Sequence, residues 1–248
     1  MKRKIIGAIF SLAVLGCIPL EANAVPTLQL DIAGGGYDYG SETIVANSDT
    51  FRLYALIRPN SSNTLSDTYY ISAALTPQVK TDASLGSFTF NGATVNATSD
   101  MSYGVPPLES ILAADKGDLA THGVFPTYFK EFDFQFSSAN RIASYNSQDR
   151  AISGGAINTA YNSNGSMYYA MFDVDVSSLA TGYNIHFDLY NATLGCTTGD
   201  IDVSKFAPFS HDAESGSTTT HSVPEPATLL LMGSGLTGLY FSRRLKRK

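Results

Sequence analysis

The stretch Phe172-Asp173-Val174-Asp175-Val176 decides the fold class of this chain. Apolar side chains occupy every second position, and aspartates occupy the positions between them. A period of two is typical of a β-strand whose two faces meet different surroundings. The stretch therefore predicts a strand with its apolar side chains on a core and with Asp173 and Asp175 on the opposite face.

The same alternation recurs along most of the sequence. Gly-rich and Asn-rich segments separate the alternating stretches, as they do between short strands. One-sided alternation favours antiparallel sheets with one face on the core and one in solvent. Strands are expected at Leu28 to Ile32, Phe51 to Ile57, Thr68 to Leu75, Ser87 to Phe90, Glu131 to Phe136, Met167 to Val176 and Tyr183 to Tyr190.

One short helix is expected within this body, over Pro107 to Lys116. Leu108, Ile111 and Leu112 share a face at helical spacing, and Gly117 follows as a terminator. Many short strands with a single helix predict an all-β domain, an antiparallel β-sandwich or jelly roll, over residues 25–210. Helices are expected otherwise only in the two terminal signals.

The C-terminus has three parts in a fixed order. Val223-Pro224-Glu225-Pro226 precedes a 15-residue apolar run, residues 227–241. As a helix this run spans about 22 Å, less than the ~30 Å hydrocarbon core of a bilayer, so it makes a poor permanent anchor. A basic cluster ends the chain and is expected to stay cytoplasmic: Arg243, Arg244, Lys246, Arg247 and Lys248.

This Pro-Glu-Pro triplet, short membrane segment and basic end resemble the PEP-CTERM sorting signal of Gram-negative bacteria, over residues 223–248. The resemblance implies recognition by exosortase, a membrane enzyme thought to act as a cysteine transpeptidase. It also implies an association with exopolysaccharide and biofilm. The alternative is a plain tail anchor whose prolines only stop the helix.

The N-terminus has the features of a secretory signal peptide, residues 1–24. Lys2-Arg3-Lys4 precedes an apolar stretch, and Ala22 and Ala24 form an A-x-A site for signal peptidase. Cleavage there leaves Val25 as the first residue of the exported protein. A second interpretation stays open, because Val14-Leu15-Gly16-Cys17 resembles a lipoprotein processing box that ends in a lipidated Cys17.

The part between the signals is markedly acidic. Residues 25–226 hold eight Lys and Arg and 21 Asp and Glu, a formal charge of −13 against −6 for the whole chain. Such a charge argues against nucleic acid as a partner and favours solubility. Cys196 remains as a single cysteine once Cys17 is removed, so no disulfide within the chain is expected. Residues 211–222, rich in Ser, Thr and Gly, are expected to form a linker.

The common catalytic motifs are missing from the sequence, and we therefore expect no enzyme and no catalytic residues. A polysaccharide hydrolase would need two facing carboxylates, for which the body offers Glu42, Glu109, Glu131 and many aspartates. A carbohydrate-binding module would stack sugars on tyrosines in the absence of tryptophan. The tyrosines available for that role are Tyr69, Tyr103, Tyr128 and Tyr168.

Four aspartates are weak candidates for a metal site, with Ca²⁺ preferred. Asp188 follows His186 on a second alternating stretch, and Asp133 lies between two phenylalanines. If their strands were neighbours of the strand that holds Asp173 and Asp175, the carboxylates would converge on a hard cation. The favoured interpretation is a solvated sheet face without a cofactor. His122, His186, His211 and His221 show no ligand spacing.

Two aromatic stretches, residues 121–129 and residues 206–213, resemble blocks of the bacterial surface domains called choice-of-anchor proteins. We interpret them mainly as loops that pack their aromatics. Together these features predict an exported, non-catalytic protein that is sorted by exosortase to the cell surface or extracellular matrix. Its expected partners are the two processing enzymes, the membrane through the C-terminal segment before processing, and extracellular polysaccharide.

Overall fold

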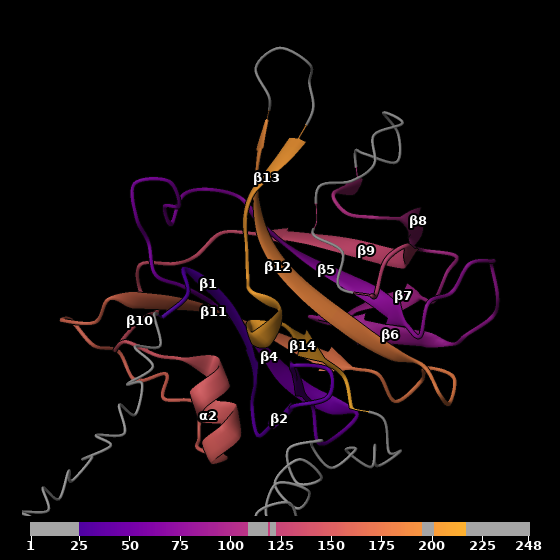
Figure 1. The fold of residues 1–248 in the computed structure, drawn as a ribbon, viewed down its shortest axis with the longest axis horizontal. Coiled ribbons are helices and arrows are strands. Elements are labelled where there is room, and N and C mark those ends of the chain that lie inside the picture. Colours follow the sequence, from indigo (N-terminus) through magenta and orange to yellow (C-terminus); the bar gives the residue numbers. More distant parts are fainter. Residues whose placement is uncertain (1–24, 109–118, 120–122, 195–200, 217–248) are drawn as a thin grey trace, which may run out of the picture.

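The computed structural model describes residues 25–108, 119, 123–194 and 201–216, and within these two β-sheets pack face to face (Figure 1). The first sheet has the order β1-β4-β11-β6-β7, with β10 also paired to β11. Its strands are β1 (Leu28–Ile32), β4 (Thr50–Ile57), β6 (Ser87–Phe90), β7 (Ala93–Asn96), β10 (Arg141–Ile142) and β11 (Met167–Asp175).

The second sheet has the order β2-β3-β14-β12-β5-β9-β8, with β13 also paired to β12. All its pairings are antiparallel except the parallel pair of β14 and β3. Its strands are β2 (Gly36–Asp38), β3 (Thr43–Val45), β5 (Tyr69–Thr76), β8 (Ser102–Gly104), β9 (Thr127–Phe134), β12 (Asn184–Leu194), β13 (Ile201–Phe206) and β14 (Ala213–Glu214). The predicted all-β sandwich is confirmed.

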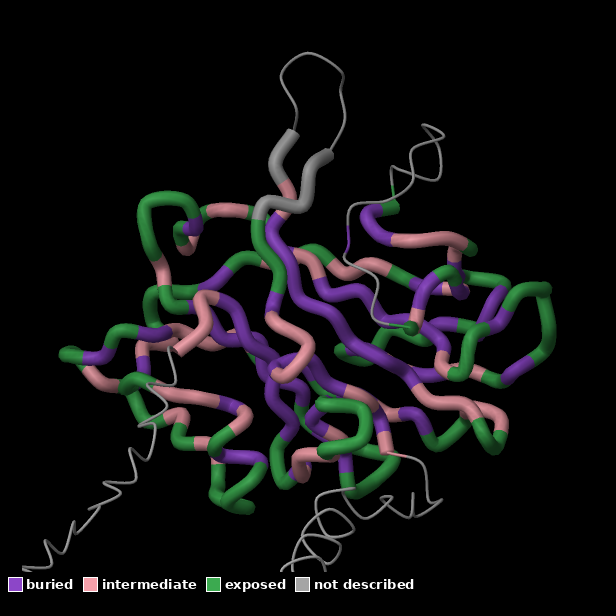
Figure 2. Tube along the Cα trace, viewed as in Figure 1, coloured by how far each residue is buried: buried purple, intermediate pink, exposed green. Residues whose placement is uncertain are grey.

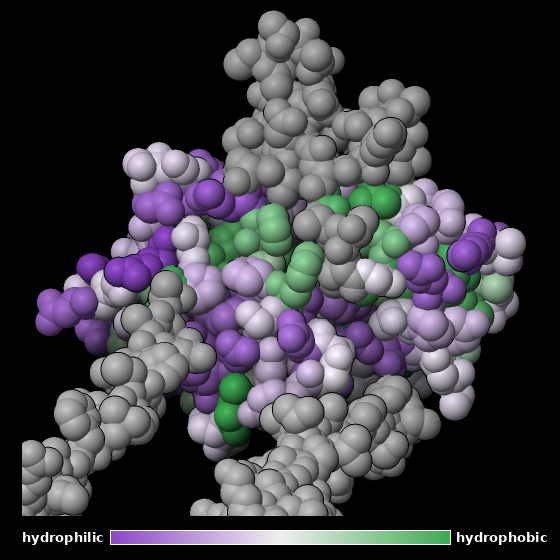
Figure 3. Space-filling view, viewed as in Figure 1, coloured by the Kyte–Doolittle hydropathy of each residue, from purple (hydrophilic) through white to green (hydrophobic). Residues whose placement is uncertain are grey.

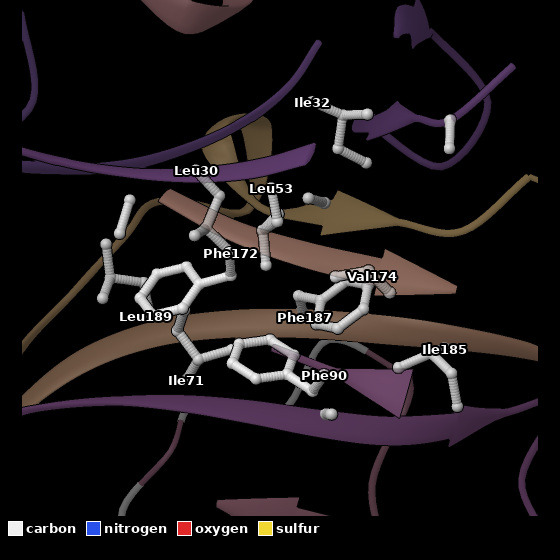
Figure 4. Packing of buried hydrophobic residues seen from close by; sticks show 14 of the residues in the cluster. Leu30, Ile32, Leu53, Ile71, Phe90, Phe172, Val174, Ile185, Phe187 and Leu189 are labelled. Atoms are coloured by element: carbon white, nitrogen blue, oxygen red, sulfur yellow. The ribbon is translucent and has the colours of Figure 1, made fainter. Parts of the chain in front are cut away.

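The hydrophobic core lies between the sheets, and both supply it with alternate side chains (Figure 4). The first sheet contributes Leu30, Leu53 and Val174, and the second contributes Ile71 and Phe187. Figure 2 shows the buried residues running along the strands in the middle of the molecule. Each such aliphatic or aromatic side chain stabilises the fold by about 1.5–3 kcal/mol.

Phe90 joins the two sheets through its ring. Its centroid lies 4.1 Å from that of Phe132 on β9 and 5.0 Å from that of Phe172 on β11, and both pairs are stacked. Aromatic pairs in this range stabilise beyond their buried area. The three rings therefore pin β6 and β11 of one sheet against β9 of the other.

The strand predictions hold wherever the alternation is long. Ser87–Phe90 is reproduced to the residue, and the strands around Leu28, Phe51 and Phe172 are confirmed. β9 begins at Thr127 rather than at Glu131, because Thr127 to Lys130 pair with β8 and β5 without any alternation in hydrophobicity. The shortest strands, with two or three residues, hold too few positions to display a period.

A helix that we did not predict covers one end of the sandwich. α2 (Ser147–Ser153) begins at Asn146, whose side chain accepts a hydrogen bond from the Asp149 amide, and ends at Gly154 in the left-handed conformation. Its Arg150 is buried and forms an ion pair with Asp31 on β1. The helix predicted over Pro107 to Lys116 lies, after Leu108, outside the described residues.

The boundary predicted after Ser210 is wrong. The 3₁₀-helix η1 (Phe209–His211) spans this boundary and β14 follows it, with Ala213 paired to both Phe187 and Ile44. Backbone pairing orders this polar segment, which its Ser- and Gly-rich composition did not reveal. The folded domain therefore extends at least to Ser215, whose hydroxyl accepts a hydrogen bond from the Ile185 amide at 2.8 Å.

The signals themselves fall outside the described residues. This holds for residues 1–24 with Ala22, Ala24 and Cys17, for Cys196, for the rest of the expected linker, and for residues 223–248. Within the part of the chain that the structure describes, no helix is long and apolar enough to cross a membrane.

Candidate functional site

The outer face of β12 carries a buried group of ionisable side chains. His186 and Asp188 point away from the core that Ile185 and Phe187 enter, as the alternation predicted. The face is not solvated, however, since His186 is 2% and Asp188 is 5% exposed. The expectation of a wet sheet face is wrong at this position.

Asp212 joins these two residues from a distant part of the sequence. It follows η1, where the chain returns from β13 to β12, and is 2% exposed. The Nε2 atom of His186 lies 3.4 Å from Asp212 Oδ2 and 3.5 Å from Asp188 Oδ1. One ligand atom from each of the three side chains lies within 4.8 Å of the other two.

Glu214 faces the other nitrogen of the same ring. Its Oε2 lies 3.6 Å from His186 Nδ1, and its Oε1 accepts a hydrogen bond of 3.0 Å from the Asn184 side chain. Because β14 pairs with β12, Glu214 is directly opposite His186. Three carboxylates thus surround one buried imidazole.

The segment that bears Asp212 is fixed from several sides. The Ile44 amide of β3 donates to the Asp212 carbonyl at 3.2 Å, and the Ala207 amide donates to Leu189 of β12 at 2.8 Å. The side chain of Asn146, which caps α2, lies 3.3 Å from His211 Nε2. The cluster is therefore built into the fold and does not sit on a loose surface loop.

Burial by itself would lower the pKa of His186, but the charge of Asp188 and hydrogen bonds to Asp188, Asp212 and Glu214 outweigh it. The pKa of His186 is raised well above its usual range. Burial raises the pKa of Asp212, and hydrogen bonds with His186 and Thr43 oppose that change. The cluster therefore holds positive charge strongly, either as a proton or as a cation.

Ser72 extends this face toward β9. From β5, Ser72 is directly opposite Asp188 of β12 on one side and Glu131 of β9 on the other, so the three side chains form one row across the sheet. Ser72 is fully buried, and its hydroxyl makes no hydrogen bond within the described chain. In the next row, the Tyr190 hydroxyl donates to Glu131.

The predicted four-aspartate site is not formed. Asp173 and Asp175 lie on β11, in the other sheet from Asp188. Asp173 is exposed and pairs with Arg52 at 3.2 Å, while Asp175 accepts a hydrogen bond from the Ser177 amide. Asp133 is exposed on β9. Only Asp188 of the four belongs to a convergent group.

The sequence did not indicate Asp212 and Glu214 as site residues, because both lie within the predicted linker, residues 211–222. One signal was available, since Ser210 to Glu214 place a histidine, an aspartate and a glutamate within a stretch otherwise poor in charge. The neighbouring His211 is also buried, and this burial lowers the pKa of its ring to about 4. His122 and His221 lie outside the described residues.

The tyrosines considered for stacking on sugars do not form one continuous surface strip. Tyr69 is fully buried, and Tyr168 lies under Arg141, whose guanidinium is 5.9 Å from the ring centroid. Tyr103 and Tyr128 are directly opposite on β8 and β9 with centroids 5.5 Å apart, and Tyr103 is 39% exposed. This pair at a sheet edge is the part of the predicted platform that remains.

The glutamates considered for hydrolysis do not converge either. Glu42 lies between β2 and β3, and three strands separate β3 from the β9 strand of Glu131. Glu109 lies outside the described residues. A cavity of about 620 Å³ opens beside β6 and β7, and none of the candidate residues lines it. The residues that line the cavity have small and mostly polar side chains. They are Asp82, Ala83, Ser84, Gly86, Ser87, Asn96, Ala97, Thr98 and Ser99.

The aromatic stretches at residues 121–129 and 206–213 both lie against the second sheet where the structure describes them. Phe125 and Phe129 pack with Tyr190 on its outer face, and the rings of Phe206 and Phe209 lie 6.0 Å apart. The predicted packing of aromatics agrees with these contacts, but the prediction of loops is wrong in part, since Thr127 to Phe129 belong to β9 and Phe206 belongs to β13. Figure 3 shows this side of the molecule as mostly polar, with hydrophobic residues in small patches.

Comparison with known families identifies a sorting motif at the C-terminal end of the sequence. Residues 222–247 match the PEP-CTERM protein-sorting motif, and this range contains the Val223-Pro224-Glu225-Pro226 stretch, the apolar run and the basic residues up to Arg247. The match covers the C-terminal signal only. None of the curated proteins matches the chain.

Proposed function

We propose that this chain, an exported protein that carries a PEP-CTERM signal and is an exosortase substrate, is a non-catalytic component of the cell surface or extracellular matrix. In this proposal its β-sandwich is the exposed functional part, and it works in association with exopolysaccharide. The observation that carries the proposal is the sorting motif at residues 222–247.

Features of the sandwich support a binding or structural role. The described glutamates considered for hydrolysis, Glu42 and Glu131, lie far apart along the second sheet. Asp188 and Asp212 do converge, but both are buried and therefore closed to a polysaccharide chain. The acidic charge of the exported body keeps such a domain soluble at high local concentration outside the cell. We therefore propose that the protein acts by contact with matrix material and not by turnover.

The test uses the native host and a strain that lacks its exosortase. We expect the processed protein in the surface and matrix fractions of the wild type, and the unprocessed C-terminal signal in the membrane fraction of the mutant. The matrix of a strain lacking this protein should contain the same polysaccharide in an altered, more easily extracted form. Hydrolysis of purified host polysaccharide by the protein would contradict the non-catalytic role.

A second candidate function is carbohydrate binding through Tyr103 and Tyr128. The two rings meet across a sheet edge, and the exposure of Tyr103 leaves an aromatic surface open to a sugar ring. Co-sedimentation with host exopolysaccharide tests it. Tyr103→Ala should reduce binding, whereas Tyr161→Ala, at a tyrosine that is 64% exposed elsewhere, should leave it unchanged.

A further inference from the structure

His186, Asp188 and Asp212 have the donor chemistry of a transition-metal site. An imidazole nitrogen with two carboxylate oxygens suits Zn²⁺ and its neighbours, whereas Ca²⁺ requires six to eight oxygens. All three side chains are at least nine-tenths buried, so the surrounding protein leaves little room for the waters that would complete a calcium shell. The donor set therefore differs from the calcium site that the sequence suggested.

The spacing of these donors fits an ion between them. The contacts from His186 Nε2 to the two carboxylates, at 3.4 and 3.5 Å, are long compared with the usual 2.7–3.2 Å of an N–H···O hydrogen bond. They equal the separations between neighbouring ligands that each contact one ion at about 2.0–2.2 Å. One ligand atom from each of the three side chains lies within 4.8 Å of the other two, so all three can face one position.

Two further observations point to a bound ligand at this place. Glu214 lies beside Nδ1 of His186, which is the position of the carboxylate that orients a metal-bound histidine in many zinc sites. Ser72 brings a fully buried hydroxyl, without a hydrogen bond in the described chain, to the position directly opposite Asp188. An additional oxygen donor therefore stands next to the three ligands.

The charges of the cluster also fit a dication. A neutral imidazole and two carboxylates have a formal charge of −2, and burying that charge without compensation is costly. One divalent ion neutralises it, whereas a single proton on the ring leaves −1 before Glu214 is counted. Binding of the ion would accompany folding, since the ligands come from β12 and from the segment after η1.

We propose that His186 Nε2, Asp188 and Asp212 bind one Zn²⁺-like transition-metal dication, with Glu214 as a positioning residue on the histidine and the Ser72 hydroxyl as a nearby donor. The ion would tie the C-terminal segment, residues 209–215, to the centre of the second sheet. This site is independent of sorting, so its failure would leave the assignment as an exosortase substrate intact.

The test begins with the exported protein purified from its host without a histidine tag. Metal analysis should give about one Zn²⁺ or Mn²⁺ per chain. After chelation, Zn²⁺ added alone should raise the melting temperature and Ca²⁺ should not, and Co²⁺ should bind with visible absorption bands. A melting temperature that responds to Ca²⁺ only would overturn the transition-metal assignment, and binding of no ion at all would overturn the site.

Substitutions of the proposed ligands test whether the ion binds at this cluster. Asp212→Asn and Asp188→Asn keep the shape of the side chain and should weaken Zn²⁺ binding by more than about tenfold. Glu214→Gln should weaken it by about tenfold. The matched control is Asp133→Asn, an exposed aspartate on the same sheet, which should bind as the wild type does. Equal loss in the control would overturn the proposal. If a ligand variant does not fold, the metal content and Zn²⁺-dependent refolding of the wild type decide.

Discussion

His186 Nε2 lies 3.4 Å from Asp212 Oδ2, although β13 and η1 separate the two residues along the chain. The contact joins the middle of the sheet to a segment whose composition resembles a linker. It makes the last described residues part of the folded domain.

Fragments that end at different residues test the domain boundary. A fragment of residues 25–222 should fold, whereas one of residues 25–210 loses β14, Asp212 and the Ser215 contact with Ile185. Removing these buried contacts should lower the free energy of unfolding by more than about 3 kcal/mol. Urea unfolding followed by circular dichroism measures the difference. Equal stability of the two fragments would restore the boundary at Ser210.

The ion pair of Arg150 with Asp31 should be essential for stability. Arg150 also donates to the Gly35 carbonyl at 2.6 Å, so it fixes α2 on β1 and on the turn that follows. Arg150→Met leaves Asp31 charged and buried, at a cost of about 3–5 kcal/mol. Arg52→Met, at the exposed pair with Asp173, should cost less than about 1 kcal/mol. Chemical unfolding of both variants gives the comparison, and similar losses would refute it.

The contact between the sheets should depend on Phe187. This fully buried ring lies 6.2 Å from Phe51 and 6.5 Å from Phe90, both of the opposite sheet. Phe187→Ala leaves a cavity and should destabilise the protein by about 3–5 kcal/mol. Met171→Ala, at a half-exposed position on β11, should change stability far less. A small effect at Phe187 would show that the core lies elsewhere.

Gly216, which follows β14, should be required for full stability of the domain. A Cβ at this position would lie 2.0 Å from the Ala46 carbonyl oxygen, so Gly216→Ala forces the backbone to shift. We expect a lower melting temperature for it. Gly36→Ala, where a Cβ would meet nothing within 4 Å, serves as the matched control. Identical melting temperatures would mean that the segment is not held against Ala46.

The alternation in Phe172-Asp173-Val174-Asp175-Val176 was sufficient to predict β11 and its core face, because period two is a local property of the sequence. The same logic placed His186 and Asp188 together on one face. It failed for Asp212 and Glu214, since their positions depend on pairing of β14 with β12 and β3. It also failed to show that other segments cover the outer face of β12, so Asp188 was expected in solvent.

We expect exosortase to recognise the carboxylate of Glu225 during sorting. The prolines on both sides fix the backbone and remove two amide donors, so the sequence predicts an extended Glu225 before the apolar run. Glu225→Gln keeps the shape and removes the charge, so unprocessed protein should accumulate in the inner membrane while export is retained. Immunoblots of fractions from the native host measure this. Normal processing and release of the variant would show that the carboxylate is not read.

Mass spectrometry of both ends of the protein from its native host tests the central claim, that the chain is exported and processed by exosortase at the motif in residues 222–247. We expect a mature chain that begins at Val25 and lacks the Arg243 to Lys248 peptide, and we expect that peptide to be retained in a strain without exosortase. An intact C-terminal peptide as the main species in the wild type would contradict this claim.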